Sequence, residues 1–218
     1  RGLLLYHGLG SGKTCSSIAI TEAFKSDKQI FIMTPASLRR NYIEELKKCG
    51  DLLYRKNQNW QFINIEENPE LLEPLSYALK LKIDFIKKNK GAWLVNLKIK
   101  ESNYDKLSSQ KQLSLDNQIV EMIKYKYQFI NYNGLRNTHI DILTKNNTIN
   151  PFDNCVIVID EAHNFISRIV NKIEHDNMDK PKFLITKLYN YLMIANNCRI
   201  ILLTGTPIIN YPNEIGIL

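Results

Sequence analysis

Apolar runs of strand length alternate with helix-like stretches along much of this chain. The strand-like runs are residues 3–6, 29–34, 60–65, 125–132, 155–159 and 199–203, and the helix-like stretches are 14–24, 36–48, 182–195 and one that begins at Asn164. The runs at 29–34 and 155–159 are continuously apolar, as expected for strands covered on both faces. We therefore predict an α/β fold, a doubly wound and mostly parallel sheet with helices on both faces.

Residues 66–126 have a different texture. Pro69 and Pro74 interrupt the start, and lysines crowd the middle at Lys80, Lys82, Lys87, Lys88, Lys90, Lys98 and Lys100. The patterns predict helices at 70–88 and 113–124, a strand or hairpin arm at 92–99 and a loop at 102–109. We interpret this segment as a helical, Lys-rich insertion. Its lysines are not interleaved with aromatic residues along the chain, so we expect a solvated face rather than a nucleic-acid track.

Composition narrows the class of protein. The 218 residues carry a net charge of +7, which favours a polyanionic partner without identifying it. No run approaches the ~18 apolar residues of a membrane span, and no signal-peptide pattern is present. Four widely spaced cysteines form no CxxC pair, which favours a reducing, intracellular compartment over a cysteine metal site. The chain does not begin with Met, and we expect it to be a piece of a longer protein.

A glycine-rich stretch at residues 7–14 joins the first strand to the first helix. Glycines allow backbone N–H groups to face an anion, and the start of a helix adds partial positive charge. The sequence therefore predicts a nucleotide phosphate loop made of Gly8, Leu9, Gly10, Ser11, Gly12, Lys13, Thr14 and Cys15. Lys13 would reach the β- and γ-phosphates, and the Thr14 hydroxyl would bind Mg²⁺. The strict pattern has glycine where this chain has His7.

Two acids, Asp160 and Glu161, follow the most β-branched strand. A carboxylate beside a buried strand is costly unless it binds something positive. Alone, the pair could be a solvated acidic turn. Beside a phosphate loop, it predicts that Asp160 and Thr14 hold Mg²⁺ and that Glu161 polarises the attacking water.

Four motifs now occur in the order found in superfamily 2 helicases. They are Lys13-Thr14 in the glycine loop, Thr34-Pro35-Ala36, the DEAH box Asp160-Glu161-Ala162-His163, and Thr204-Gly205-Thr206-Pro207. They resemble motifs I, Ia, II and III of the first RecA-like domain. Residues 203–210 are similar to the Swi/Snf branch. Leu5-Tyr6-His7 more closely resembles the helicase-like ATPases of large nucleocytoplasmic DNA viruses, the early-transcription-factor and nucleoside triphosphatase I type.

The resemblance implies ATP and Mg²⁺ as cofactors and gives roles to further residues. The coupling residues between nucleotide and nucleic acid would be His163, Thr204, Gly205 and Thr206, while Thr34, Pro35, Arg39, Arg40 and Asn133 would lie near the nucleic-acid backbone. His163 could instead cap a helix, and the two arginines could be a solvated face. The threonine usual in motif Ib is absent near Asn133.

The implied function is a motor domain that couples ATP hydrolysis to translocation along nucleic acid or to its remodelling, with DNA favoured over RNA. Residues 1–218 would be the first RecA-like domain, and a second one with an arginine finger would come from elsewhere in the protein. Because such a finger supplies ~10³–10⁵ of the rate, we expect the fragment to hydrolyse ATP poorly.

Alternatives to this motor remain. One is the ATPase subunit of a viral transcription initiation or termination factor, with RNA polymerase as a partner, and another is a nucleotide-gated interaction module. A ring-forming ATPase is disfavoured by the Thr-Gly-Thr-Pro turn. If the protein is viral, the virion or the host cytoplasm is the expected location.

Overall fold

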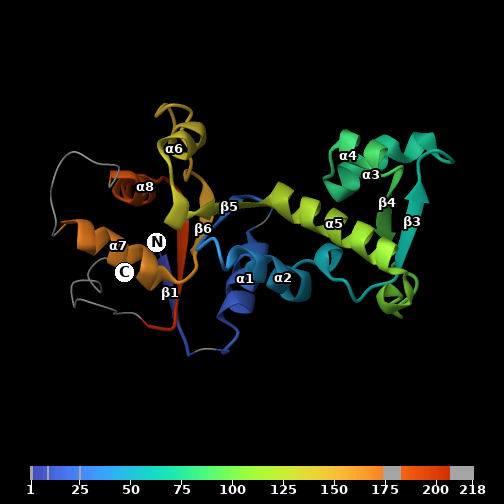
Figure 1. Ribbon diagram of the computed structural model, residues 1–218, viewed down its shortest axis with the longest axis horizontal. Coiled ribbons are helices and arrows are strands. Elements are labelled where there is room, and N and C mark those ends of the chain that lie inside the picture. The colour runs from blue at the N-terminus through green and yellow to red at the C-terminus, as the bar shows by residue number, and fades with distance from the viewer. Residues whose placement is uncertain (1, 9, 25, 174–182, 207–218) are drawn as a thin grey trace. The chain divides into compact units, whose positions relative to one another are not determined.

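The computed structural model describes residues 2–8, 10–24, 26–173 and 183–206. The chain forms two compact units, which are treated separately (Figure 1). The first, Arg1–Tyr42 with Tyr127–Leu218, is called the sheet unit, and the second, Ile43–Lys126, is called the helical unit. Among the described residues, no helix combines the length and apolarity needed to cross a membrane.

The sheet unit is built on five parallel strands. They are β1 (Gly2–Tyr6), β2 (Gln29–Thr34), β5 (Tyr127–Asn131), β6 (Cys155–Ile159) and β7 (Arg199–Thr204), in the order β1-β7-β6-β2-β5. Every residue of β6 is buried, which fits its continuous apolar sequence and its central place. The predicted parallel α/β sheet is confirmed.

Helices cover both faces of this sheet. The helices are α1 (Lys13–Ala23), the start of α2 (Arg39–Cys49), α6 (Asn137–Leu143), α7 (Ala162–Ile173) and α8 (Phe183–Ile194). Figure 1 shows α7 and α8 on one side of the strands and α1 on the other. Side chains alternate between the two faces of each strand. On one face, Phe31 and Ile157 belong to a buried cluster that includes Phe165 of α7 and Leu188 of α8. Buried free thiols, Cys155 and Cys198, lie in that cluster.

The helical unit has its own small core. It contains η1 (Leu52–Tyr54), β3 (Trp60–Asn64), η2 (Pro69–Leu71), α3 (Leu72–Leu79), α4 (Ile83–Lys88), β4 (Gly91–Val95), η3 (Tyr104–Lys106) and α5 (Ser109–Lys126). β3 and β4 pair as an antiparallel ribbon. Gln118 of α5 joins the ribbon to the helix, because its side chain accepts from Trp93 N and donates to Trp93 O, both at 2.7 Å.

The bounds and elements of this unit differ from several expectations based on the sequence. It begins at Ile43, whereas the predicted insertion begins at residue 66. The strand expected at 60–65 is present but lies in the ribbon and not in the main sheet. The single helix predicted at 70–88 is two helices, because the backbone turns left-handed at Lys80 (φ 54°). The strand predicted at 92–99 ends at Val95.

Candidate nucleotide site

Parallel pairing brings the sequence-predicted site residues to one edge of the sheet. Tyr6 pairs with Thr204, and Met33 pairs with Ile159. The phosphate loop, the acids after β6 and the turn after β7 therefore all follow carboxyl ends of neighbouring strands. In open α/β sheets, this edge is where ligands bind.

The phosphate loop is an open cradle. Gly10 and Gly12 have φ values of 75° and 78°, in the left-handed region that favours glycine. A Cβ added at Gly8, Gly10 or Gly12 would meet no atom within 4 Å. Gly12 is also the N-cap of α1, so the loop leads directly into the first turn, where backbone N–H groups have no partner within the helix. Leu9 lies outside the described residues.

Lys13 joins the loop to the turn after β7. Its ammonium donates to the main-chain oxygens of His7 at 2.6 Å and Gly8 at 3.0 Å. A Cβ on Gly205 would lie only 3.4 Å from Lys13 Nζ. The ammonium thus lies at the meeting point of residues that are almost 200 positions apart in the sequence. Thr14 and Cys15 follow it, half-buried, in the first turn of α1.

The environment of Asp160 disfavours the ionised form of its carboxyl group. Burial, and then the charge of Glu161, raise its pKa to about 6. The hydroxyl of Thr34 (3.3 Å to Oδ2), the Glu161 N–H (3.1 Å to Oδ1) and the charge of Lys13 act in the opposite direction. A bound cation would stabilise the ionised carboxylate, which burial and the neighbouring acid destabilise. Lys13 and Asp160 therefore share one electrostatic environment.

Glu161 adopts a left-handed backbone (φ 49°), which is uncommon for a residue with a side chain. Tyr132 supports this turn, since its hydroxyl donates to the main-chain oxygens of Asp160 at 3.0 Å and Glu161 at 3.1 Å. The Tyr132 ring is buried and packs edge-on against Phe165. Sequence reasoning placed Tyr132 together with Asn133 at the position of motif Ib. Nothing in the sequence indicates its hydrogen bonds.

His163 connects the acids to the turn after β7. Its Nδ1 lies 2.8 Å from Thr204 Oγ1, 3.3 Å from Thr206 Oγ1 and 3.5 Å from a carboxylate oxygen of Glu161. Thr204 Oγ1 donates to Thr206 O at 2.9 Å, so the proton of the His163 contact belongs on Nδ1. The arrangement brings together three of the predicted coupling residues. Gly205 lies between the two threonines, and residues 207–210 lie outside the described part of the chain.

The residues predicted to lie near nucleic acid separate into three places. Pro35 and Asn133 line a hollow of about 270 Å³, together with Ser37, Leu38, Asn164 and Arg168. Thr34 does not reach this surface, because its side chain is buried and its hydroxyl faces Asp160. That expectation is therefore revised for Thr34. Arg168 is an exposed cation of α7 that sequence reasoning missed.

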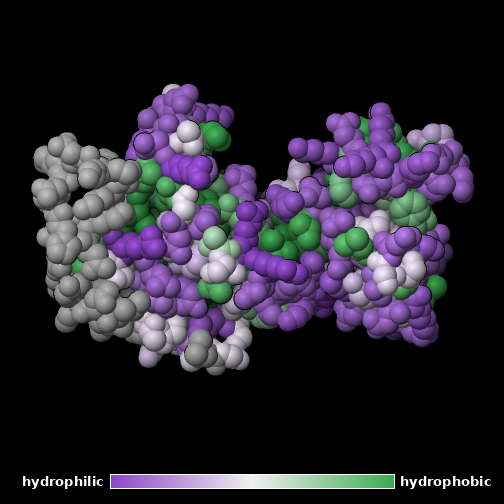
Figure 2. Space-filling model, viewed as in Figure 1, coloured by the Kyte–Doolittle hydropathy of each residue, from purple (hydrophilic) through white to green (hydrophobic). Residues whose placement is uncertain are grey.

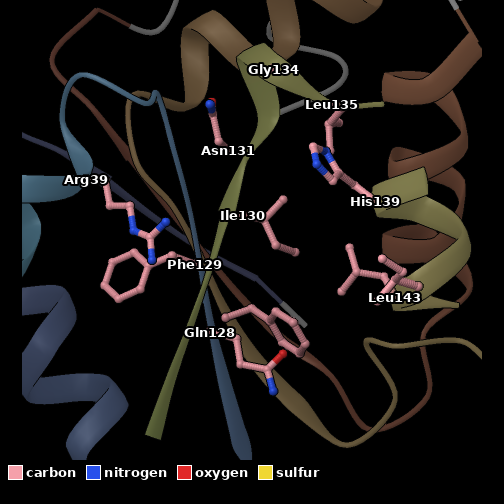
Figure 3. A pocket seen from close by; sticks show the side chains of 11 residues that line it. Arg39, Gln128, Phe129, Ile130, Asn131, Gly134, Leu135, His139 and Leu143 are labelled. Atoms are coloured by element: carbon pink, nitrogen blue, oxygen red, sulfur yellow. The ribbon is translucent and has the colours of Figure 1, made fainter. Parts of the chain in front are cut away.

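Arg39 lies elsewhere, over the ring of Phe129 with 5.0 Å between its guanidinium carbon and the ring centroid. Both line a hollow of about 330 Å³ that runs along the outer edge of β5 towards α6 (Figure 3). Leu135, His139 and Leu143 form its far wall, as Figure 3 shows. Arg40 is exposed near the start of α2. Neither arginine lines the hollow that contains Asn133.

Three relatives of this chain are viral proteins. It is 31% identical over its whole length to "Putative ATP-dependent RNA helicase R563" of Acanthamoeba polyphaga mimivirus, of which it covers 28%. It is 26% identical over 98% of its length to "Termination factor NPH-I homolog" of African swine fever virus, covering 21% of that protein. It is 24% identical over 98% of its length to "Putative helicase 087L" of Invertebrate iridescent virus 3, covering 17%.

The chain thus spans less than a third of each of these relatives. These matches confirm the predicted resemblance to helicase-like proteins of large DNA viruses. A family model described as "Type III restriction enzyme, res subunit" matches residues 1–209, and it agrees with the observed parallel sheet and phosphate loop. The chain therefore belongs to this helicase-like family, ResIII.

Proposed function

We propose that this chain is the ATP-binding motor domain of a superfamily 2 helicase or translocase, which couples ATP hydrolysis to movement along nucleic acid or to its remodelling. One observation carries the proposal. Lys13, the Asp160–Glu161 pair and the His163–Thr204 contact occupy the same edge of one sheet, although they come from opposite ends of the sequence.

The residues at this edge fit a magnesium-bound triphosphate. The open glycine cradle suits an anion, and Lys13 would bind the terminal phosphates. Hydroxyl and carboxylate oxygens are ligands that Mg²⁺ prefers, so Thr14 and Asp160 would hold the ion. Bound Mg²⁺ would neutralise phosphate charge. Glu161, whose turn is supported by Tyr132, would accept the proton of the attacking water.

The coupling of nucleotide state to nucleic acid is proposed to run through two contacts. His163 links the acids to Thr204 and Thr206, and Tyr132 links them to the hollow lined by Asn133. That hollow is lined by hydrogen-bond donors from which phosphate oxygens could accept, on Arg168, Asn133 and Ser37. We propose nucleic acid as its ligand, with DNA favoured over RNA.

A second candidate is the ATPase subunit of a viral transcription initiation or termination factor. The name of the African swine fever virus relative favours it. Such a protein would also bind RNA polymerase. Recovery of polymerase with the longer protein, but not with an unrelated helicase, would support this candidate. A nucleotide-gated docking module is a third, and unchanged function of a Glu161→Gln protein would support it.

ATP hydrolysis tests the proposal. The longer protein should hydrolyse ATP faster when DNA or RNA is added, and Glu161→Gln should abolish this while Glu70→Gln, an exposed acid of the helical unit, should not. Residues 1–218 alone should show low activity, because the arginine finger expected from a second RecA-like domain is worth ~10³–10⁵ in rate. Robust DNA-stimulated hydrolysis by residues 1–218 would contradict the need for that domain. An inactive full-length protein would contradict the motor.

A further inference from the structure

A hollow of about 290 Å³ lies in the helical unit, between the α3–α4 junction and the end of α5. Leu81 and Phe85 form an apolar part of its lining, while Lys80, Lys82 and Lys124 surround it with ammonium groups. Figure 2 shows mostly hydrophilic surface over α3 and α4. The hollow therefore combines an apolar lining with a positive rim.

The positive charge of the rim is only partly neutralised. Seven lysines and one acid, Asp84, lie between residues 80 and 100. Glu121 also lines the hollow, and it pairs with Lys124 at 2.6 Å. Among the ion pairs of the described residues, Lys80 and Lys82 have no acidic partner. Two ammonium groups thus remain available to an anionic ligand.

Exposed aromatic rings accompany these lysines. The Tyr125 side chain is 63% exposed and lines the hollow, and Tyr77 is 78% exposed. Lys80 Nζ lies 4.0 Å from the centroid of the Tyr77 ring. The sequence expectation of a purely solvated lysine face was based on the lack of neighbouring aromatics. That basis was wrong, because Tyr77 lies only three residues before Lys80 and Tyr125 directly follows Lys124.

Lys80 occupies a position where glycine would fit better. It ends α3 with φ 54° and ψ 36°, the left-handed conformation that favours glycine. Ser76 fixes the turn, since its hydroxyl donates to Leu81 O at 2.6 Å and its own main-chain oxygen accepts from Leu81 N at 3.2 Å. A side chain at this point has a conformational cost, so glycine could replace Lys80 without strain in the backbone.

We propose that this lysine–tyrosine hollow binds single-stranded nucleic acid, as a contact additional to the one proposed for the sheet unit. The inference rests on the proposed function, since it presumes that the protein acts on nucleic acid. Phosphates would accept from Lys80 and Lys82, and bases would stack on Tyr77 and Tyr125. An acidic peptide would match the charges but would leave the two rings without stacking partners.

Fluorescence anisotropy of a labelled oligothymidylate tests the hollow, with residues 1–218 and no nucleotide present. The variant Lys80→Gln/Lys82→Gln/Lys124→Gln should bind at least tenfold more weakly. The slope of log affinity against log salt should fall by about 1.4, since Lys80 and Lys82 would each make one phosphate contact and single strands lose about 0.7 per contact. The control Lys87→Gln/Lys88→Gln/Lys98→Gln removes equal charge from exposed positions of the same unit, and it should lose less than about threefold.

Three further variants separate binding from folding. Lys80→Gly removes the ammonium and relieves the left-handed backbone, so its unfolding temperature should stay equal or rise while binding weakens. Tyr125→Phe should keep oligonucleotide affinity, whereas Tyr125→Ser should lose severalfold, because stacking needs the ring and not the hydroxyl. A Lys80→Gly protein that is both less stable and weaker in binding would assign Lys80 a structural role.

Equal losses in the two triple variants would overturn the proposal, because they would show an effect of net charge alone. Polyglutamate that competes as well as the oligonucleotide would replace nucleic acid with an acidic protein as the ligand. The motor proposal is judged separately by ATP hydrolysis in the longer protein. The binding experiment contains no nucleotide, so either proposal can fail without the other.

Discussion

The hydroxyl of Tyr132 donates a hydrogen bond to the main-chain oxygen of Glu161 at 3.1 Å. Glu161 is the acid proposed to activate water, and its left-handed backbone needs support. Asn133, the next residue after Tyr132, lines the hollow proposed for nucleic acid. One peptide unit therefore separates a surface contact from the support of the catalytic turn.

Tyr132→Phe should lower kcat for ATP hydrolysis by the longer protein on the order of tenfold, with little change in KM for ATP. The substitution removes two hydrogen bonds but keeps the ring that packs on Phe165. Loss of the hydroxyl should also reduce the free energy of unfolding by about 1–2 kcal/mol. Steady-state kinetics and urea unfolding measure the two effects.

Tyr104→Phe is the matched control for this substitution, because the Tyr104 hydroxyl also donates a hydrogen bond, to Asp116 at 3.2 Å, but belongs to the helical unit and not to the sheet unit that contains the nucleotide site. Stability lost without any change in kcat would show that Tyr132 only supports the fold.

Thr204→Val should uncouple ATP hydrolysis from nucleic-acid binding. The variant preserves shape but loses the contact with His163 at 2.8 Å and the bonds with Thr206. ATP binding should persist while stimulation of hydrolysis by nucleic acid falls. Thr206→Val removes only the longer 3.3 Å contact with His163, so its effect should be smaller. The ratio of stimulated to basal rates gives the ranking, and the reverse order would contradict this account.

Asp160→Asn should stabilise the nucleotide-free protein at neutral pH. The folded-state pKa is raised from 3.8 to about 6, so the folded chain holds the proton more tightly than the unfolded chain. Ionised Asp160 therefore destabilises the fold above pH 6, and this cost disappears as the pH falls from about 6 to below about 4.

Asp160→Asn should raise the free energy of unfolding by up to about 3 kcal/mol at pH 8, and this gain should vanish near pH 3.5. Urea unfolding across this pH range measures it, with exposed Asp84→Asn as the control. If Asp160→Asn were less stable than the natural chain at pH 8, ionised Asp160 would not destabilise the fold. Magnesium-dependent ATP binding should show the opposite trend, strengthening as the pH rises through about 6.

Gly12→Ala should destabilise the chain by about 1–2 kcal/mol, because a Cβ is disfavoured at its φ of 78°. Gly8→Ala is the control, since its Cβ would also meet no atom within 4 Å but its backbone is not left-handed. Thermal unfolding without nucleotide compares the two. Equal midpoints would mean that the loop does not keep this conformation in solution.

The sequence predicts well where one local signal dominates. The run 155–159 matches β6 residue for residue, because a continuous β-branched stretch has few alternatives to a central strand. The order of glycine loop, acids and Thr-Gly-Thr turn likewise predicts the shared sheet edge, since parallel strands deliver their carboxyl ends together.

Prediction is weaker where tertiary contacts decide. The break at Lys80 depends on a left-handed turn fixed by Ser76 and Leu81, which helix propensity does not indicate. α6 was not predicted, because its seven residues are short and weakly patterned. The support of Glu161 by Tyr132 joins residues 29 positions apart and leaves no periodic trace.

The central claim is that Lys13 and Asp160 act on the same magnesium-bound nucleotide, and calorimetric titration of ATP into residues 1–218 tests it most directly. With Mg²⁺ present, one ATP should bind weakly per chain. Lys13→Met should reduce affinity at least tenfold, exposed Lys111→Met should not, and Asp160→Asn should remove most of the dependence on Mg²⁺. Equal affinities for the natural chain and Lys13→Met, or an undiminished Mg²⁺ dependence in Asp160→Asn, would contradict the claim.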